Sequence, residues 1–343
     1  MKSNQLCRPH TSEQKIYNKA MKKAQISLIM TVLNEADTIQ LLLQAITKQT
    51  LLPNEVIIVD GGSQDQTVVI IEKFINNLPL SSQKKLNFTL KKLPNSNRSQ
   101  ARNWAIKHSQ HDLIAITDAG CIPQPNWLKN LVASYQASPA DIVGGYFYGL
   151  PATAFEQAVV AYTLITPGKL NPDHFMPTTR SVLMQKSAWK KLNGFDETLA
   201  LNEDFEFFYR AKKLQLKFNF AQDALVAWLP RKNLKEFSTM IFRFAQGDIQ
   251  SGILRPKVVL VFGRYLLALL AILGLLSFTP VAIERLVMII GFWLVIYLVW
   301  AIQKNLEAVP QGWYWLPALQ ITADLAVMTG SLIGLGSYKR NKQ

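Results

Sequence analysis

The chain has 343 residues, and its 37 lysines and arginines against 23 aspartates and glutamates give a formal net charge of +14 at pH 7. Hydrophobic residues make up 49% of it and charged residues 17%, which excludes global disorder, because disordered chains combine low hydrophobicity with high charge. The two cysteines exclude a disulfide scaffold, and the charged fraction, below the roughly 25% of soluble domains, predicts that part of the chain does not face water.

The first predicted segment is a basic extension over residues 1–24. It contains no apolar run, and its cations are Lys2, Arg8, Lys15, Lys19, Lys22 and Lys23. A secretory signal peptide has an apolar stretch behind its basic start, so none is predicted here. We therefore expect the soluble part of the protein to stay on the cytoplasmic side of a membrane.

Residues 25–230 are predicted to form a soluble α/β domain. Short apolar runs predict strands at residues 26–32, 56–59, 86–90 and 113–117, and apolar residues at helical spacing predict helices at residues 39–46 and 68–75. Strands that alternate with helices favour a parallel sheet, whose strands are covered on both faces and therefore read as continuous apolar runs. A mostly parallel sheet is expected.

Polar residues follow three of these strands directly. Asn34 and Glu35 follow the first strand, Asp60 follows the second, and Asp118 follows the fourth. In open α/β sheets, ligands bind beyond the carboxyl ends of the strands. Each residue alone would suit a turn or a helix cap, but acidic residues at three strand ends on one sheet edge predict a ligand site there.

Five short motifs occur in order along this part of the chain. They are Thr31-Val32-Leu33-Asn34-Glu35, Val59-Asp60-Gly61-Gly62-Ser63-Gln64-Asp65-Gln66-Thr67, Asn97-Arg98-Ser99-Gln100-Ala101-Arg102-Asn103, Thr117-Asp118-Ala119-Gly120-Cys121, and Asn193-Gly194-Phe195-Asp196-Glu197 with Asn202-Glu203-Asp204. Each motif is weak alone, but together, over roughly residues 25–250, they make the sequence similar to the family 2 glycosyltransferases.

The resemblance implies a GT-A-type nucleotide-sugar domain and an inverting transfer, with one displacement and no covalent intermediate. Such a reaction needs a carboxylate that removes the proton of the acceptor hydroxyl. The resemblance gives this role to Asp204, with Glu203 as the alternative within the same pair. The other interpretation of the pair is an acidic helix start, which the helix dipole favours.

The same resemblance implies residues that bind the nucleotide-sugar donor. Asp60 is expected to contact the nucleoside, with Thr31 and Glu35 beside it. Arg98 is expected to face the phosphates, where a guanidinium pairs two oxygens; a solvated arginine at a helix start is the alternative. Arg180 is expected to contact an anionic acceptor or the donor phosphates, and a surface ion pair is its alternative.

Two departures from the family pattern are glycines. Gly61 stands where a second aspartate is common, and Gly120 replaces the second carboxylate of the Asp-x-Asp motif. The divalent cation that the resemblance implies, Mg²⁺ or Mn²⁺, is therefore expected at Asp118 alone. Mg²⁺ can be held by one or two carboxylates together with substrate phosphates, so the cation remains part of the expectation.

Residues 231–257 are predicted to form an amphipathic helix at the membrane surface. Leu234, Phe237, Ile241 and Phe244 fall on one helical face. The basic residues around that face are Arg231, Lys232, Lys235, Arg243, Arg255 and Lys257. Such a helix suits the boundary between cytosol and anionic lipid, and a helix packed on a soluble core is the alternative.

Residues 258–336 are predicted to hold about three transmembrane helices, followed by a basic tail at residues 337–343. The apolar stretches cover residues 258–279, 286–302 and 313–335, and about 20 mostly apolar residues are needed to cross a bilayer. Buried helices of a soluble core are one alternative. Two spans, with one apolar segment that lies in the interface or re-enters the membrane, are another.

One acidic residue interrupts the third apolar stretch. Asp324 lies near its middle, and a carboxylate inside a membrane needs a partner or a cavity. Arg264, in the first stretch, is one candidate partner, and a cavity is the alternative.

These features predict a membrane-anchored inverting glycosyltransferase. Its expected partners are a nucleotide-sugar donor, a lipid-linked or surface-saccharide acceptor and membrane lipids, and the sequence contains no nucleic-acid-binding motif. One alternative is a polyprenyl-phosphate glycosyltransferase, whose acceptor oxygen is already an anion. Another is a non-catalytic membrane protein that keeps the fold to bind a nucleotide or a partner.

Overall fold

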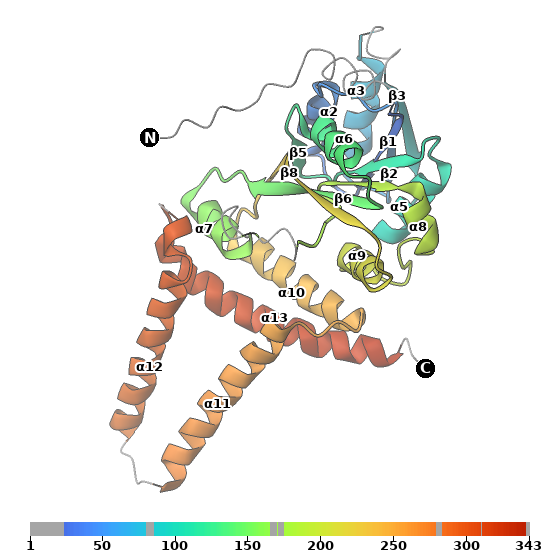
Figure 1. The fold of residues 1–343 in the computed structure, drawn as a ribbon. Helices are drawn as coiled ribbons and strands as arrows, with labels where there is room; N and C mark the ends of the chain where they lie inside the picture. Colours follow the sequence, from blue (N-terminus) through green and yellow to red (C-terminus); the bar gives the residue numbers. More distant parts are fainter. Residues whose placement is uncertain are drawn as a thin grey trace, which may run out of the picture. The chain divides into compact units, whose positions relative to one another are not determined.

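The computed structural model describes residues 24–79, 86–164, 170, 175–278, 283–309 and 311–340 (Figure 1). The expected basic extension therefore lies outside the described residues, apart from Ala24. The chain divides into two compact units. The first is made of Met1–Phe147, Phe175–Phe195 and Phe207–Ala227, and the second of Tyr148–His174, Asp196–Glu206 and Trp228–Gln343.

The described residues contain an eight-stranded sheet with the order β3-β2-β1-β4-β7-β6-β8-β5. The strands are β1 (Ile26–Val32), β2 (Glu55–Asp60), β3 (Asn87–Lys92), β4 (Leu113–Ile116), β5 (Cys121–Pro123), β6 (Ile142–Gly149), β7 (Val182–Gln185) and β8 (Phe218–Trp228). Strands β3, β2, β1 and β4 are parallel, whereas β7 is antiparallel to both β4 and β6. The sheet is thus mixed, and its four predicted strands form the parallel half.

The helices of the first unit are α2 (Ile39–Thr47), α3 (Thr67–Asn76), α5 (Arg98–His108), α6 (Trp127–Ala137) and α8 (Lys186–Lys191), and α9 (Glu203–Lys213) runs from the second unit into the first. The start of α5 is set by a capping box. The Asn97 side chain accepts the backbone N–H of Gln100, and the Gln100 side chain accepts that of Asn97. This cap places Arg98 at the first position of the helix.

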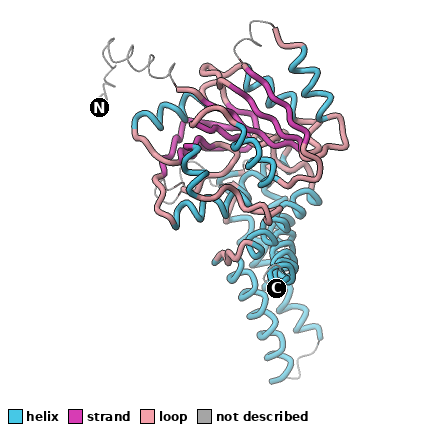
Figure 2. The backbone as a smooth tube through the Cα atoms, turned by 90° about the vertical axis from the view of Figure 1, so that its right-hand side faces the viewer, coloured by secondary structure: helices cyan, strands magenta, loops and turns pink. Residues whose placement is uncertain are grey.

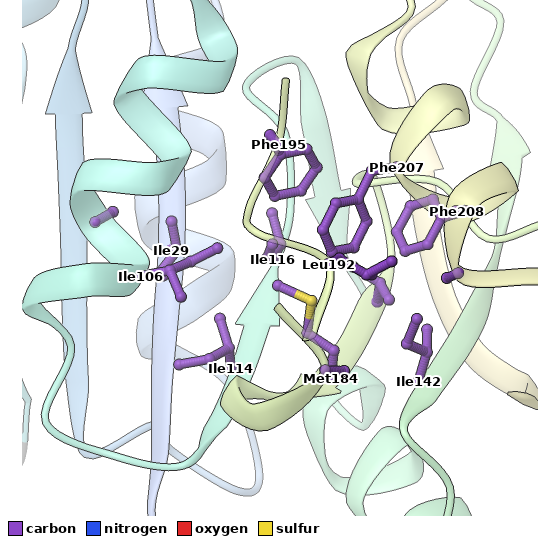
Figure 3. Close-up of a cluster of buried hydrophobic side chains, with 14 of the residues drawn as sticks. Ile29, Ile106, Ile114, Ile116, Ile142, Met184, Leu192, Phe195, Phe207 and Phe208 are labelled. Carbon is purple, nitrogen blue, oxygen red and sulfur yellow. The ribbon is translucent and has the colours of Figure 1, made fainter. Parts of the chain in front are cut away.

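One hydrophobic cluster of the first unit lies between the sheet and α5, α8 and the part of α9 that belongs to this unit (Figure 3). Phe195 stacks on Phe207 with ring centroids 4.2 Å apart, and Phe207 meets Phe208 edge to face at 5.4 Å. Such aromatic pairs add roughly 0.5–1.5 kcal/mol each beyond the area they bury. This packing holds α5 against β1, β2 and β4 and so fixes where its polar N-terminal turn lies.

The helices of the second unit are α7 (Ala154–Thr163), α10 (Leu234–Gln250), α11 (Pro256–Phe278), α12 (Ile283–Gln303) and α13 (Leu316–Arg340), with the short 3-10 turn η4 (Trp313–Trp315) before α13. Among the described residues, three segments are long and apolar enough to cross a membrane: Pro256–Gly274, Glu284–Gln303 and Trp313–Gly336. Only 6% of the residues in each of the first two segments are buried, against 44% of the residues in the third.

The third apolar segment owes its burial to α10. Helix α13 runs along α10 and across the ends of α11 and α12 (Figures 1 and 2). A Cβ at Gly330 would lie 2.5 Å from the backbone oxygen of Phe242, and one at Gly334 would lie 2.8 Å from that of Gln246. The two glycines, one helical turn apart, therefore permit a close approach of the two backbones, as small residues do at helix interfaces.

The face that α10 buries differs from the predicted apolar face. Phe237 is fully buried, but Leu234 and Phe244 are 37% and 43% exposed, so only part of the predicted apolar face packs inward. The helix also ends at Gln250, before the end of the predicted segment, and a turn connects it to α11.

Asp324 has the predicted partner. Its Oδ2 lies 2.6 Å from Nη2 of Arg264 and accepts the hydroxyl of Tyr265 at 3.0 Å and that of Tyr297. Its Oδ1 accepts a hydrogen bond from the Gln320 side chain at 3.0 Å. These contacts join α13 to α11 and α12, and they compensate the charge of a carboxylate that is 1% exposed.

Candidate active site

The polar strand ends lie on one edge of the sheet, as predicted. Parallel pairing sets Val32 opposite Asp60 and Ile29 opposite Ile116, so β1, β2 and β4 all end at this edge. The strand order also reverses there, because β2 and β3 lie on one side of β1 and β4 on the other. Such a reversal leaves a crevice where α/β proteins bind ligands.

The loops after β1 and β2 are joined by hydrogen bonds between the first two motifs. The backbone N–H of Asn34 donates to Oγ of Ser63 at 2.9 Å, and that of Glu35 donates to the Thr67 hydroxyl at 2.7 Å. Ala36 N–H donates to Asp65 at 3.1 Å. The serine, aspartate and threonine of the second motif therefore fix the loop that carries Glu35, while Thr31 lies at the half-buried end of β1.

Asp60 organises its own loop. Its carboxylate is 3% exposed and accepts the backbone N–H groups of Gly62 at 3.0 Å and Ser63 at 3.1 Å, and the Ser63 hydroxyl at 2.5 Å. Gly61, where the family favours an aspartate, would bring a Cβ to 3.2 Å from the Ser96 carbonyl. The close approach of this carbonyl is a physical reason for glycine at that position.

Asp118 is paired with Arg102, a residue to which the motifs assign no role. Arg102 is 2% exposed, and its Nη2 lies 3.0 Å from Oδ1 of Asp118 and 3.0 Å from the Thr179 hydroxyl. The Thr179 hydroxyl in turn donates to Oδ2 of Asp118 at 3.1 Å. The sequence does contain one indication of this burial. Arg102 falls on a face of α5 whose other residues are small or apolar, and that face packs on the core.

Two more arginines act on Asp118 electrostatically. Burial alone would raise the pKa of this carboxyl, but the charges of Arg102, Arg180 and Arg98, with the Thr179 hydrogen bond, hold it below its usual value. Arg98 is exposed at the first turn of α5, and the Arg180 guanidinium lies 4.8 Å from the centre of the Phe147 ring. The edge of the sheet at β4 is therefore positively charged despite its aspartate.

The residues at this edge fit a divalent cation only in part. In the described part of the chain, no three His, Cys, Asp or Glu side chains are grouped as metal ligands. Gly120 has φ +76°, a left-handed conformation that glycine adopts without strain, and a Cβ there would meet nothing within 4 Å. Asp118 is 28% exposed, and each oxygen keeps a lone pair, so it suits a cation shared with donor phosphates.

The cysteine beside this loop is buried, and its surroundings favour the protonated thiol. Burial, with the nearby carboxylates of Asp118 and Glu35, raises the pKa of the Cys121 thiol to about 12. A thiol in that state is almost wholly protonated at neutral pH, and the thiolate is the reactive form.

Hydrogen bonds of Asn103 connect the third motif to the fifth. Its side-chain oxygen accepts the indole N–H of Trp189 and the backbone N–H of Phe195, both at 2.9 Å, and its amide donates to the Phe195 carbonyl at 2.8 Å. A Cβ at Gly194, where φ is +77°, would lie 2.7 Å from that oxygen. The Gly-Phe pair is thus held by α5.

The acidic pair lies in the first turn of α9. Glu203 is 2% exposed, and Asp204 is half-buried, with Oδ1 accepting the backbone N–H of Phe205 at 2.8 Å. Both residues belong to the second unit, whereas the candidate donor-binding residues belong to the first: Thr31, Glu35, Asp60, Arg98, Asp118 and Arg180. The roles predicted for all eight remain proposals.

The sequence was compared with known families and proteins. The profile described as Glycosyl transferase family 2 matches residues 27–190. Glycosyltransferase AglE of Haloferax volcanii is 28% identical over 264 residues, which cover 74% of this chain and 82% of that protein. The dolichyl N-acetyl-alpha-D-glucosaminyl phosphate 3-beta-D-2,3-diacetamido-2,3-dideoxy-beta-D-glucuronosyltransferase of Methanococcus voltae is 28% identical over 243 residues, 65% of this chain and 73% of that protein.

A solved structure has a similar fold. The mannosyltransferase PcManGT of Pyrobaculum calidifontis, in complex with GDP-Man and Mn²⁺, matches with a TM-score of 0.60 and 16% sequence identity, and the match covers 94% of each chain. At that identity the similarity shows the fold alone. The α/β domain has the GT-A-type fold that the motifs predicted.

Proposed function

We propose that this chain, which carries a family 2 glycosyltransferase domain, transfers a sugar, with inversion, from a nucleotide-sugar donor to a lipid-linked or surface-saccharide acceptor at the cytoplasmic face of a membrane. The observation that carries the proposal is the cluster of Arg98, Arg102 and Arg180 around Asp118 at the reversal of strand order. A nucleoside diphosphate is an anionic leaving group, and cations fixed in advance stabilise it as it departs.

Each residue of the cluster has a part in donor binding. Arg102 neutralises and orients Asp118, because it is buried and paired with it at 3.0 Å. Arg98 and Arg180 supply positive charge to the phosphates, since the carboxylate that faces them is already compensated by Arg102. Asp60 and the loop it organises, with Thr31 and Glu35 nearby, form the nucleoside side of the site.

A divalent cation, Mg²⁺ or Mn²⁺, would be held by Asp118 together with the phosphates of the donor. When bound, it would supply further positive charge to the leaving group. The arginines provide charge of the same sign, so the site does not depend on the cation alone.

Asp204 is the proposed base, with Glu203 as the alternative. In the transfer, the acceptor oxygen forms a bond to the anomeric carbon of the donor sugar, and the bond from that carbon to the phosphate oxygen breaks. The electron pair of the broken bond leaves with the nucleoside diphosphate, and the proton of the acceptor hydroxyl passes to the carboxylate. Asp204 is favoured over Glu203 because its side chain is the less buried of the two.

The proposed acceptor is attached to the membrane. The acidic pair belongs to the unit that contains the three apolar helices, and the Methanococcus voltae relative is named for a dolichyl-linked substrate. The proposed base Asp204 and the membrane helices belong to the same unit, so an acceptor at the lipid surface would be within reach of the base.

We propose that α11 and α12 span the bilayer as a hairpin, while α13 and α10 lie together at its surface. Helices of 23 and 21 residues are about 34 and 31 Å long, which matches a hydrocarbon core of about 30 Å. Helix α13 crosses the ends of this hairpin (Figure 1). The exposed aromatic rings of Trp313 and Tyr314 before it are typical of the membrane interface.

Charge gives the hairpin its orientation. Arg255 and Lys257 flank the start of α11 and Lys304 follows the end of α12, whereas the opposite end carries Glu284 beside Arg285. Cytoplasmic loops are rich in lysine and arginine, so we propose that the end next to α13 faces the cytoplasm. The basic tail at residues 337–343 then lies on the same side, whereas three spans would put it outside.

Cysteine labelling from outside intact cells tests this arrangement. In a cysteine-free background, a cysteine at Thr279, between α11 and α12, is expected to react with an impermeant reagent, and one at Ser337 is expected to react only after permeabilisation. Labelling at Ser337 in intact cells would support three spans instead.

A transfer assay tests the activity itself. The full-length protein in lipid nanodiscs is incubated with labelled UDP-, GDP- or dTDP-sugars, first screened by thermal stabilisation, since a ligand at 100 times its Kd adds about 2.7 kcal/mol. The expected result is release of nucleoside diphosphate and label in a polyprenyl-diphosphate-linked saccharide, with none for Asp118→Ala. Transfer to polyprenyl phosphate alone, unaffected by Asp204→Asn, would favour the alternative activity, and no transfer or hydrolysis with any donor would contradict the proposal.

A further inference from the structure

An ion pair joins the end of α10 to the turn before α11. Asp248, in the last turn of α10, is 4% exposed. Its Oδ2 lies 2.6 Å from Nε of Arg255, and its Oδ1 accepts a hydrogen bond from Nη2 of the same arginine at 2.8 Å. The Nη2 contact is a charge-assisted hydrogen bond, which is stronger than one between neutral groups, and the Nε contact is a close approach of opposite charges. No part of the donor site described above uses this pair.

The ion pair also holds the chain just before the acidic pair. The Asn202 side-chain amide donates to Oδ1 of Asp248 at 2.8 Å, and the Asn202 carbonyl accepts the backbone N–H of Glu206 at 3.1 Å, which begins α9. Asn202 has φ +60°, an uncommon conformation outside glycine that asparagine tolerates better than most residues. The start of α9 therefore depends on a residue that Asp248 holds.

Two further contacts act on the same segment. A Cβ at Gly247 would lie 2.8 Å from the Cβ atoms of both Leu201 and Asn202, so α10 approaches this segment as closely as a glycine permits. On the other side of Asp204, the Arg255 guanidinium lies 4.1 Å from the centre of the Phe205 ring, within the range of a cation–π contact.

We propose that Asp248 and Arg255 are positioning residues. Asp248 lies at the end of α10 and Arg255 just before α11, and together they hold the start of α9 and with it the base Asp204. The inference rests on the proposed function, because it takes Asp204 as the base. Asn202 and Phe205, the residues held, lie on either side of the Glu203-Asp204 pair. General-base catalysis requires the carboxylate within hydrogen-bond reach of the acceptor proton, so displacement of this segment lowers turnover.

Arg255 also compensates Asp248 electrostatically. Burial raises the pKa of Asp248, and Asp204 raises it further, while the hydrogen bond and charge of Arg255 and the Asn202 hydrogen bond lower it. Without Arg255, a second buried carboxylate would lie uncompensated beside the base.

The experiment is a double-mutant cycle on the full-length protein in nanodiscs. Asp248→Asn and Arg255→Gln are expected to lower kcat by about 10- to 100-fold, because misplacement of a reacting group by about 1 Å costs up to about 100-fold. The donor KM is expected to stay unchanged. In the Asp204→Asn background, Asp248→Asn is expected to cause no further loss, since it acts through Asp204.

The controls separate positioning from folding. Glu236→Gln removes a carboxylate from the exposed start of α10, where it caps the helix with Asn233, and is expected to leave kcat unchanged. Arg255→Lys keeps the charge and most of the volume but not the paired contacts, so it is expected to fold and to lose less activity than Arg255→Gln. Thermal unfolding is measured for every variant.

The outcomes distinguish this inference from the proposed function. Wild-type kcat in Asp248→Asn and Arg255→Lys, with Asp204→Asn inactive, would overturn the positioning role and leave the base in place. A further loss from Asp248→Asn in the Asp204→Asn background would also overturn it, because the effect would then not pass through Asp204. Wild-type turnover in Asp204→Asn would overturn the base assignment, and the positioning role with it.

Discussion

The guanidinium of Arg102 lies 3.0 Å from the carboxylate of Asp118 and is almost wholly buried beneath it. The pair connects α5, which carries Arg98 at its first position, to the end of β4, where the donor phosphates are proposed to bind. Asp118 is thus both part of the site and the counter-charge of a buried cation, and its loss is expected to affect stability as well as activity.

Asp118→Asn is expected to destabilise the protein by about 3 kcal/mol, because breaking a buried ion pair leaves one charge uncompensated. The pKa of Asp118 is lowered from 3.8 in the folded protein, so the stability it contributes is fully present above about pH 4 and is lost as the pH falls through the folded value. The difference in Tm between wild type and variant should be constant from pH 7 to 5 and shrink below pH 3.8. A constant difference down to pH 2.5 would contradict the ion-pair explanation.

Chelation is expected to lower transfer without abolishing it. Asp118 offers a cation one carboxylate, and Arg98 and Arg180 supply positive charge that EDTA does not remove. Activity in EDTA should therefore stay above that of Asp118→Ala, and Mg²⁺ or Mn²⁺ should restore it. Full activity in EDTA, with Asp118→Ala inactive, would mean that Asp118 orients the donor without a metal.

Asp204→Asn is expected to lower kcat by at least about 100-fold while the donor KM stays unchanged, because the amide keeps the shape but cannot accept a proton. Glu203→Gln, the matched change at the neighbouring and more buried position, is expected to cost less. Retention of more than about a tenth of wild-type turnover by Asp204→Asn would rule out this base, since general-base catalysis typically contributes about 10²–10⁴-fold.

Gly330→Ala is expected to loosen α13 from α10 and to cost about 1–3 kcal/mol, the usual range for overpacking, because its Cβ would lie 2.5 Å from a backbone oxygen. Gly336→Ala is the control on the same helix, since a Cβ there meets nothing within 4 Å. Thermal unfolding and limited proteolysis in nanodiscs should separate the two variants. Equal Tm values would show that the helices do not pack through Gly330.

The parallel half of the sheet was predictable because its strands are short apolar runs that end in polar motifs. The prediction for β3 was displaced by one residue at its start and two at its end, since half of that strand is exposed and its pattern is mixed. The strands beyond β4 were not predicted. An apolar run identifies a buried strand but carries no information on its direction, so the antiparallel β7 could not be inferred from Val182 and its neighbours.

The candidate site was proposed from the sequence motifs, and residues that the motifs do not assign were missed. Arg102 and Thr179 received no role because a side chain that acts on another side chain, and not on a ligand, has no distinctive sequence pattern. The pairing of α13 with α10 was missed for a related reason. Hydropathy reports how apolar the third stretch is. It does not report that Gly330 and Gly334 leave room for the backbone of α10.

The division of the chain into two units has a practical consequence for producing the protein. The second unit takes residues 148–174 and 196–206 from within the first. Phe155 of α7 packs edge to face on Trp315 at 5.2 Å, and Asn202 is bound to Asp248 of α10. A fragment cut after β8 to gain solubility would keep these two inserts but lose Trp315 and Asp248, which Phe155 and Asn202 contact. Expression of the catalytic part alone is therefore expected to yield an aggregating or inactive product, and detergent or nanodisc preparation of the whole chain is the route to an active enzyme.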